Sequence, residues 1–301
     1  MRILVTDGMD KTAMAALRAC GHEVIEQYYE PDQLGAALQS VDAVIIRSKT
    51  KIRAKQIDEA KGGQLKLIIR GGVGVDNIDV SYAEAAGIAV RNTPRASSQS
   101  VAELAMAHMF AASRYVSIAG HTMREGKWEK KSYGKGIELF GKTLGIIGFG
   151  RIGQKLCAMA KAMGMDVIAF DIFHIPGVEE QMGMRYVELD ELFAQADFIS
   201  LHTPAIDGKP LINAENIAKM KDGVIFVNTS RGNNVDEAAL LDALNSGKIR
   251  GAGLDVFVDE PSANEALYSH PNVSCTPHIG AATVEAQKRI GEEIVEIIRN
   301  F

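Results

Sequence analysis

Short apolar runs alternate with longer amphipathic stretches along most of the chain. In the first third, apolar runs predict strands, and two amphipathic stretches between them predict helices at 11–20 and 31–39. The predicted strands are 2–6, 23–25, 43–46, 66–69 and 87–90. Strands that alternate with helices form a parallel sheet whose two faces are covered. The first third is therefore predicted to be a doubly wound α/β domain.

The same alternation resumes after a stretch rich in alanine and methionine at 97–114, which predicts one long helix that connects two domains. Later strands are predicted near 143–147, 166–170, 197–201, 224–228, 251–254 and 273–275. A helix at 284–299 is expected to return to the first domain. We therefore predict an α/β protein of two doubly wound parallel-sheet domains, 1–96 with 284–301 and 97–283, with a ligand cleft between them.

The composition narrows the class of protein. Of 301 residues, 47% are hydrophobic and 24% are charged, which is typical of a soluble globular protein. A formal net charge of −5 argues against a nucleic-acid surface. There is no signal-peptide pattern and no apolar run long enough to span a membrane, and Cys20, Cys157 and Cys275 form no closely spaced pair. We expect a cytoplasmic protein without a metal, a membrane or a nucleic-acid partner.

Residues 142–153 carry the most specific pattern of the chain. An apolar strand leads into Gly148-x-Gly150-x-x-Gly153 and then into a helix-like run at 154–163. The first glycine allows a tight turn, the second lets the backbone approach a pyrophosphate, and the third lets the helix pack on the strand. The next strand ends in Asp171, where a carboxylate binds a ribose hydroxyl and repels the 2′-phosphate of NADP. These features predict NAD as the cofactor.

Four polar residues of the second half follow predicted strands. They are Arg231, Asp255, Glu260 and His278. The loops at the ends of strands are where α/β enzymes keep their catalytic groups. Taken singly, such residues are more often found in a surface ion pair, a turn or a structural role than in catalysis.

Taken together, these segments resemble one family, the D-isomer-specific 2-hydroxyacid dehydrogenases. The shared segments are Gly-Phe-Gly-Arg-Ile-Gly at 148–153, Asn-Thr-Ser-Arg-Gly at 228–232, Asp-Val-Phe-x-x-Glu-Pro at 255–261, Thr-Pro-His-Ile-Gly-Ala-Ala-Thr at 276–283, and 70–79 in the first domain. The resemblance covers essentially the whole chain. It implies an NAD-dependent dehydrogenase with a flavodoxin-like substrate domain and a Rossmann NAD domain.

The resemblance places the catalytic arginine, glutamate and histidine of the family on Arg231, Glu260 and His278. Reduction of a 2-keto acid needs a hydride and a proton, and imidazole suits the proton step because it titrates near neutral pH. Glu260 would hydrogen-bond the far ring nitrogen and favour imidazolium. The planar fork of Arg231 would hold the substrate carboxylate and polarise the carbonyl.

The same resemblance implies the contacts to NAD. Arg151 and Ile152 would offer backbone N–H groups to the pyrophosphate, Thr203 and Pro204 would line the adenosine side, and Asp255 would bind the nicotinamide carboxamide. The full expected set is Gly148, Gly150, Arg151, Ile152, Gly153, Asp171, Thr203, Pro204, Thr229, Ser230, Arg231, Asp255, His278, Gly280 and Ala281.

Two arginines of the first domain bear on the substrate. Arg47 follows one predicted strand and Arg70 ends the next. Two arginines beyond the carboxylate site suggest a second anionic group, most simply a phosphate, while the backbone N–H groups of Val73 and Gly74 would bind a carboxylate. The alternative is that both arginines only pair with local acids. The phosphate pattern resembles the D-3-phosphoglycerate dehydrogenases, in which a basic residue near the position of Lys130 reaches the site of the neighbouring subunit.

We therefore expect NAD-dependent oxidation of D-3-phosphoglycerate to 3-phosphohydroxypyruvate and the reverse reduction, the first step of serine biosynthesis. The expected form is a homodimer whose contacts include the helix that starts near Ser97. Because the chain stops at Phe301, no regulatory domain and no serine feedback are expected. A glyoxylate/hydroxypyruvate reductase or a dehydrogenase of larger 2-keto acids is the alternative. An NAD(H)-sensing binding protein that resembles the C-terminal-binding corepressors remains a more remote one.

Overall fold

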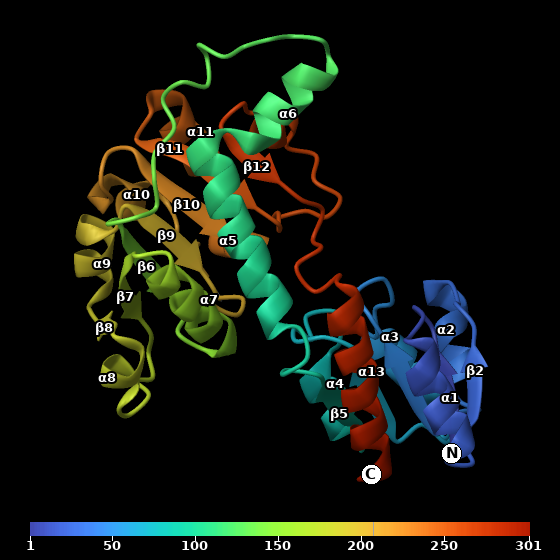
Figure 1. The fold of residues 1–301 in the computed structure, drawn as a ribbon. Helices are drawn as coiled ribbons and strands as arrows, with labels where there is room; N and C mark the ends of the chain where they lie inside the picture. The colour runs from blue at the N-terminus through green and yellow to red at the C-terminus, as the bar shows by residue number, and fades with distance from the viewer. Residues whose placement is uncertain (207) are drawn as a thin grey trace. The chain divides into compact units, whose positions relative to one another are not determined.

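The computed structural model describes residues 1–206 and 208–301 and divides the chain into two compact units (Figure 1). One unit contains residues 1–98 and 281–301, and the other contains residues 99–280. The divisions fall at 98/99 and 280/281, two or three residues from the predicted 96/97 and 283/284. Ala281, expected to contact the cofactor, therefore belongs to the first unit.

The first unit is a five-stranded parallel sheet in the order β2-β1-β3-β4-β5, which is the flavodoxin-like order. Its strands are β1 (Arg2–Val5), β2 (Glu23–Glu26), β3 (Ala43–Ile46), β4 (Leu67–Arg70) and β5 (Ala89–Asn92). Its helices are α1 (Lys11–Ala19), α2 (Pro31–Leu38), α3 (Ala54–Ala60), α4 (Val80–Ala85) and α13 (Val284–Arg299). Every residue of β3 is buried, because helices cover both faces of a parallel sheet.

Two layers of apolar side chains enclose this sheet. The layer on one face comes from α2, α3 and α4, and contains Leu34, Ile57 and Ala83. The other face is covered by α1 and α13, so the last helix completes the core of the first unit. Gly291 allows α13 to lie close to α1 (Figure 1), because a Cβ at this position would stand 2.6 Å from the Cβ of Ala13.

The second unit is a seven-stranded parallel sheet in the order β12-β11-β10-β9-β6-β7-β8, which contains the Rossmann arrangement. Its strands are β6 (Thr143–Ile147), β7 (Asp166–Phe170), β8 (Arg185–Tyr186), β9 (Phe198–Leu201), β10 (Val224–Asn228), β11 (Ile249–Leu254) and β12 (Val273–Cys275). The prediction of two doubly wound parallel-sheet domains is confirmed. The edge strand β8 was missed, because two residues form no apolar run.

The helices of the second unit are α5 (Ser98–Arg114, of which Ser98 belongs to the first unit), α6 (Val116–Arg124), α7 (Arg151–Ala162), α8 (Val178–Met182), α9 (Leu189–Gln195), α10 (Ala214–Lys219), α11 (Glu237–Ser246) and α12 (Glu265–Tyr268), with a 3-10 turn η1 at Gly232–Asn234. The helix expected from residue 154 begins three residues earlier, directly after Gly150. None of the helices in the described residues is both long and apolar enough to cross a membrane.

Helix α5 lies directly on the sheet of the second unit because β11 carries two glycines on one face. A Cβ at Gly253 would stand 2.4 Å from the Cβ of His108, and one at Gly251 would stand 3.5 Å from the Cβ of Ala112. His108 and Ala112 are one helical turn apart, so they meet glycines two residues apart in the strand. The polar side chain of His108 is buried in this contact.

Candidate active site

The glycine-rich turn between β6 and α7 has the geometry that a dinucleotide requires. Gly148 has a φ of +93°, and a Cβ there would stand 2.7 Å from the carbonyl oxygen of His202. A Cβ at Gly153 would stand 2.5 Å from the carbonyl oxygen of Gly148, whereas Gly150 faces open space. Because Gly150 has no side chain to cap α7, the N–H groups of the first turn remain open to an anion. The cradle therefore fits a pyrophosphate.

Asp171 closes this turn on the side of β7. Its Oδ2 accepts the N–H of Phe149 at 2.6 Å, and its Oδ1 accepts the N–H of Phe173 at 3.0 Å. Each carboxylate oxygen can accept two hydrogen bonds. Both oxygens of Asp171 therefore retain capacity for ribose hydroxyl groups.

The segment after β9 is held by a residue that the sequence did not single out. The side-chain amide of Asn234 donates to Thr203 Oγ1 at 3.0 Å and to the carbonyl oxygen of Pro204 at 2.8 Å, while its Oδ1 accepts the N–H of Ile206 at 2.9 Å. Asn234 is fully buried. It fixes the backbone that would line the adenosine. No sequence signal singles it out, because its neighbours at 229–237 are mostly polar as well.

A second asparagine shapes the loop after β10. Asn228 Oδ1 accepts both the N–H and the hydroxyl of Ser230, at 2.9 and 2.8 Å, and its amide donates to the carbonyl oxygen of Arg231 at 2.9 Å. The hydroxyl of Thr229 is buried and has no hydrogen-bond partner among the described residues. The Arg231 guanidinium donates to the carbonyl oxygen of Ser230 at 2.7 Å.

Asp255 anchors the loop that carries His278. Its Oδ1 accepts the Thr276 hydroxyl at 2.6 Å and the N–H of Ile279 at 2.8 Å, and its Oδ2 accepts the N–H of Gly280 at 2.8 Å. The N–H of His278 donates to the Asp255 carbonyl oxygen at 2.8 Å. Two donors fill Oδ1, so only Oδ2 keeps capacity for the expected nicotinamide carboxamide.

His278 and Glu260 form a hydrogen-bonded pair. Nδ1 of His278 lies 2.7 Å from Oε2 of Glu260, whose Oε1 accepts the N–H of Phe257 at 3.3 Å. Partial burial raises the pKa of Glu260, but the hydrogen bond and charge of His278, the Phe257 N–H and the positive charge of Arg231 outweigh this, and the pKa lies below its usual value. Glu260 is therefore ionised at neutral pH. Since Nδ1 is occupied, Nε2 is the ring nitrogen that can exchange a proton with a substrate.

In the first unit, Arg47 and Arg70 lie at the carboxyl ends of neighbouring strands. Ile46 of β3 pairs with Arg70 of β4, and Arg47 follows directly. Asp7 accepts the N–H of Arg47 at 2.7 Å, and the Asn77 amide donates to the Arg47 carbonyl oxygen at 2.6 Å, so the loop backbone is fixed at both sides of this residue.

Gly72 accommodates the Arg70 guanidinium, a role that the sequence did not reveal. Gly72 has a φ of +148°, and a Cβ at this position would stand 1.3 Å from Nη1 of Arg70. The same Nη1 donates to the carbonyl oxygen of Gly71 at 3.3 Å. Val73 is exposed and its carbonyl oxygen accepts the Asn92 amide at 2.5 Å, while Lys130 lies exposed between α6 and β6.

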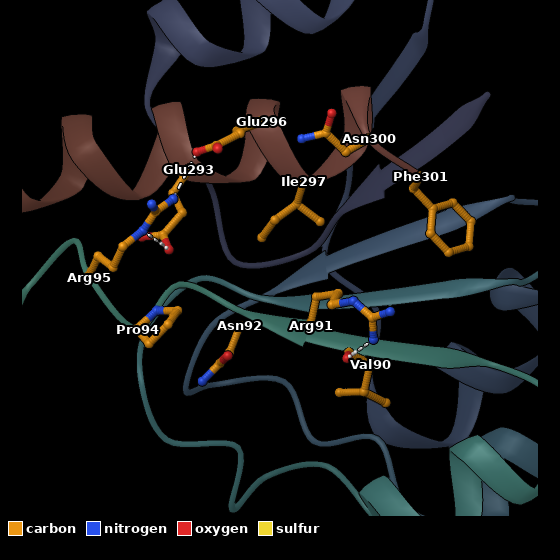
Figure 2. Close-up of a pocket in the computed structure, with 10 residues that line it drawn as sticks. All are labelled: Val90, Arg91, Asn92, Pro94, Arg95, Glu293, Glu296, Ile297, Asn300 and Phe301. Carbon is orange, nitrogen blue, oxygen red and sulfur yellow. Dashed lines mark hydrogen bonds and ion pairs between the residues drawn. The ribbon is translucent and has the colours of Figure 1, made fainter.

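A pocket of about 370 Å³ lies elsewhere on the first unit, between β5 and α13 (Figure 2). Its only ion pairs join Arg95 to Glu293 at 3.2 Å and to Glu296 at 2.8 Å, as far as the described residues show. The positive charge of Arg95 is therefore already balanced by these two carboxylates. None of the predicted site residues lines this pocket.

The second unit matches a known protein family. A family model described as "D-isomer specific 2-hydroxyacid dehydrogenase, NAD binding domain" matches residues 106–280. The chain belongs to this family of dehydrogenases. The expected enzyme class and the expected cofactor, NAD, are thereby confirmed.

Relatives of this dehydrogenase carry several substrate names. It is 50% identical to a hydroxypyruvate reductase of Thermotoga maritima, over 99% of this chain and 97% of the relative. It is 44% identical to a D-3-phosphoglycerate dehydrogenase of Methanocaldococcus jannaschii, over 99% of this chain but 57% of the relative. The chain thus spans little more than half the length of the second relative.

Solved structures of the family resemble this dehydrogenase over nearly its full length. A glyoxylate reductase from Paecilomyes thermophila matches with a TM-score of 0.90 and 32% identity, covering 99% of this chain and 94% of that one. The D-lactate dehydrogenase from Aquifex aeolicus, solved with NAD and lactic acid, matches with a TM-score of 0.86 and 30% identity, covering 99% and 94%. These neighbours share the chemistry of small 2-hydroxy acids but not one substrate.

Proposed function

We propose that this dehydrogenase interconverts D-3-phosphoglycerate and 3-phosphohydroxypyruvate with NAD, as the first step of serine biosynthesis in the cytoplasm. The observation that carries the proposal is the pair Arg47 and Arg70 at the carboxyl ends of β3 and β4. A simple 2-keto acid has one carboxylate, for which Arg231 and backbone N–H groups suffice. Two further guanidinium groups match a phosphate, which guanidinium binds through paired hydrogen bonds.

The residues of the second unit account for the chemical step. NAD, when bound, exchanges a hydride with the substrate carbon. Nε2 of His278 gives a proton to the carbonyl oxygen in the reduction and takes it from the hydroxyl group in the oxidation. Glu260, 2.7 Å from Nδ1, stabilises the imidazolium form. Arg231 binds the carboxylate and polarises the carbonyl group.

Besides the contacts of Arg231 and His278, we assign the remaining substrate contacts to the first unit, and we assign all the NAD contacts except that of Ala281 to the second. Arg47 and Arg70 bind the phosphate, and the N–H groups of Val73 and Gly74 bind the carboxylate. The NAD contacts are those expected from the sequence, with Gly148, Arg151, Ile152 and Asp171 at the pyrophosphate and ribose. The glycine cradle and the free capacity of the Asp171 carboxylate support this assignment.

We further propose a homodimer in which Lys130 reaches the site of the neighbouring subunit. Helix α6 has no buried residue, and three apolar side chains in and after it are exposed: Val116 at 59%, Met123 at 58% and Trp128 at 79%. Such neighbouring apolar exposure is typical of a subunit interface. Trp128→Ser is expected to weaken the dimer, which can be measured by sedimentation velocity at several protein concentrations. A wild-type protein that is monomeric at all these concentrations would rule out the dimer.

The substrate is tested by comparing NADH oxidation with 3-phosphohydroxypyruvate and with hydroxypyruvate. We expect the phosphorylated acid to be preferred, and Arg47→Ala to lower kcat/KM for it by roughly 100-fold, as for loss of about 3 kcal/mol from a charge-assisted hydrogen bond. The same variant should keep its rate with hydroxypyruvate. Arg91→Ala, an exposed arginine of β5, is the control. Equal loss with both acids would contradict a phosphate site.

Hydroxypyruvate reduction is the second candidate, because the Thermotoga maritima relative with that name matches over 97% of its own length. A wild-type enzyme that uses hydroxypyruvate as well as the phosphorylated acid would establish it. Arg47 and Arg70 would then serve the structure of their loops.

A further inference from the structure

A continuous chain of side-chain hydrogen bonds runs through the second unit to Asp255. Ser117 Oγ lies 3.0 Å from Ser274 Oγ, which lies 3.0 Å from Nδ1 of His108. Nε2 of His108 lies 3.0 Å from Thr276 Oγ1, whose hydroxyl donates to Asp255 Oδ1 at 2.6 Å. These hydrogen bonds join α6, α5, β12 and the two loops that carry Glu260 and His278.

The Asp255 carboxylate determines which group donates in each hydrogen bond of this series. An ionised carboxylate only accepts, so Thr276 must donate to Asp255, and its oxygen is left to accept from Nε2–H of His108. His108 is 2% exposed, and burial lowers its pKa although the negative charge of Asp255 opposes the effect. The ring is therefore neutral at neutral pH, and its Nδ1 accepts from Ser274, which in turn accepts from Ser117.

This chain of hydrogen bonds ends at the carboxylate of Asp255, which holds the loop that carries His278. Asp255 holds the N–H groups of Ile279 and Gly280 with its carboxylate and the N–H of His278 with its carbonyl oxygen. His278 has a φ of +53°, which is unfavourable for a residue with a Cβ. The contacts with Asp255 therefore help to hold His278 in this conformation.

We propose that His108 is a positioning residue for His278. Its Nε2–H tautomer fixes the Thr276 hydroxyl on Asp255, and Asp255 holds the backbone that aims the imidazole of His278. The proposal rests on the proposed role of His278 in proton transfer. Gly253 is what admits His108 to this place, since any side chain there would occupy the position of its Cβ.

The tautomer gives a test that needs no activity. In protein labelled with ¹⁵N-histidine, the ring of His108 is assigned as the one whose signals disappear in His108→Gln, and we expect this ring to be neutral with its proton on Nε2 at pH 7.5. An Nδ1–H tautomer or an imidazolium at this position would overturn the proposal. The result is independent of which substrate the enzyme uses.

Matched variants then separate positioning from packing. The amide nitrogen of glutamine can stand where Nε2 stands, whereas that of asparagine reaches only the Nδ1 position. We expect His108→Gln to keep kcat within about threefold of wild type, and His108→Asn and Thr276→Val to lose roughly tenfold, as for one hydrogen bond to a charged group. Thr276→Ser should retain activity, and Ser117→Ala, at the far end, should have little effect.

Thermal midpoints of all variants are measured alongside kcat, with whichever 2-keto acid the wild type reduces. A glutamine variant as slow as the asparagine variant, or losses of kcat that follow the thermal midpoints, would overturn the positioning role. If instead His278→Ala kept wild-type turnover, the proposed proton transfer would fail while the tautomer result stood. The two failures are therefore distinguishable.

Discussion

Replacement of Glu260 by glutamine removes one charge from the candidate site and little else. Glutamine has nearly the same volume and still offers an oxygen to Nδ1 of His278, which lies 2.7 Å from the present carboxylate. In the proposed mechanism, the reduction needs imidazolium to donate a proton, and the carboxylate would stabilise that form. In Glu260→Gln, imidazolium is less stable, so we expect reduction to lose activity at a lower pH than in the wild type.

The size of the shift follows from the distance and the exposure. Two unit charges 2.7 Å apart interact by about 1.5 kcal/mol in water and by about 6 kcal/mol at an effective dielectric constant of 20. The side chains of His278 and Glu260 are 43% and 39% exposed, so solvent screens the pair strongly. We therefore expect the charge of Glu260 to contribute about 0.7–1.4 kcal/mol of interaction free energy. This corresponds to a shift of roughly 0.5–1 pH unit in the midpoint of the activity profile.

The assay is the initial rate of NADH oxidation with a saturating 2-keto acid across the pH range in which both proteins are folded. Glu215→Gln is the matched control, because Glu215 is an exposed carboxylate of the same unit that pairs with Lys209. Added salt should move the wild-type midpoint toward that of the variant, since screening weakens the pair. An unchanged midpoint, or a uniform loss of rate without a shift, would refute the reasoning.

Three further predictions concern single positions. His278→Ala should lose roughly 10²–10⁴-fold in kcat through the missing proton transfer while NADH binding, followed by fluorescence titration, stays unchanged; near-normal turnover would contradict its role. Gly148→Ala should lower the free energy of unfolding in urea by about 1–3 kcal/mol and weaken NADH binding, because the φ is +93° and a Cβ would stand 2.7 Å from the His202 carbonyl oxygen; wild-type values for both would show that the turn relaxes freely. Asp171→Ala should raise the NADPH/NADH ratio of kcat/KM by about tenfold or more through lost charge repulsion, and an unchanged ratio would argue against Asp171 as the discriminating residue.

Most strands could be predicted from the sequence because parallel strands are buried on both faces. Runs such as Ala43–Ile46 and 224–227 are continuously apolar. The short helices α3 and α4 were missed because their few buried residues give little periodicity. Helix α6 was missed for a related reason, since none of its residues is buried.

The sequence offers a set of candidate site residues but not the contacts between them. The order of motifs located Arg231, Glu260 and His278, and the structure places Glu260 against Nδ1 of His278. The supporting residues Asn228 and Asn234 went unnoticed, because a side chain that bonds a loop backbone has no fixed spacing from it in the sequence. Such roles depend on the loop conformation, which only the fold defines.

Glu260 and Asp255 illustrate two different uses of a carboxylate near one histidine. Glu260 is part-exposed and contacts the imidazole ring, so its effect is on charge and is limited by solvent. Asp255 is 1% exposed and holds the loop through three donors to its carboxylate and one to its carbonyl oxygen. Hydrogen bonds to a buried charge are strong enough to offset a left-handed residue, which costs about 1–3 kcal/mol. We therefore expect Asp255 to act on the position of the His278 ring and Glu260 to act on it through charge.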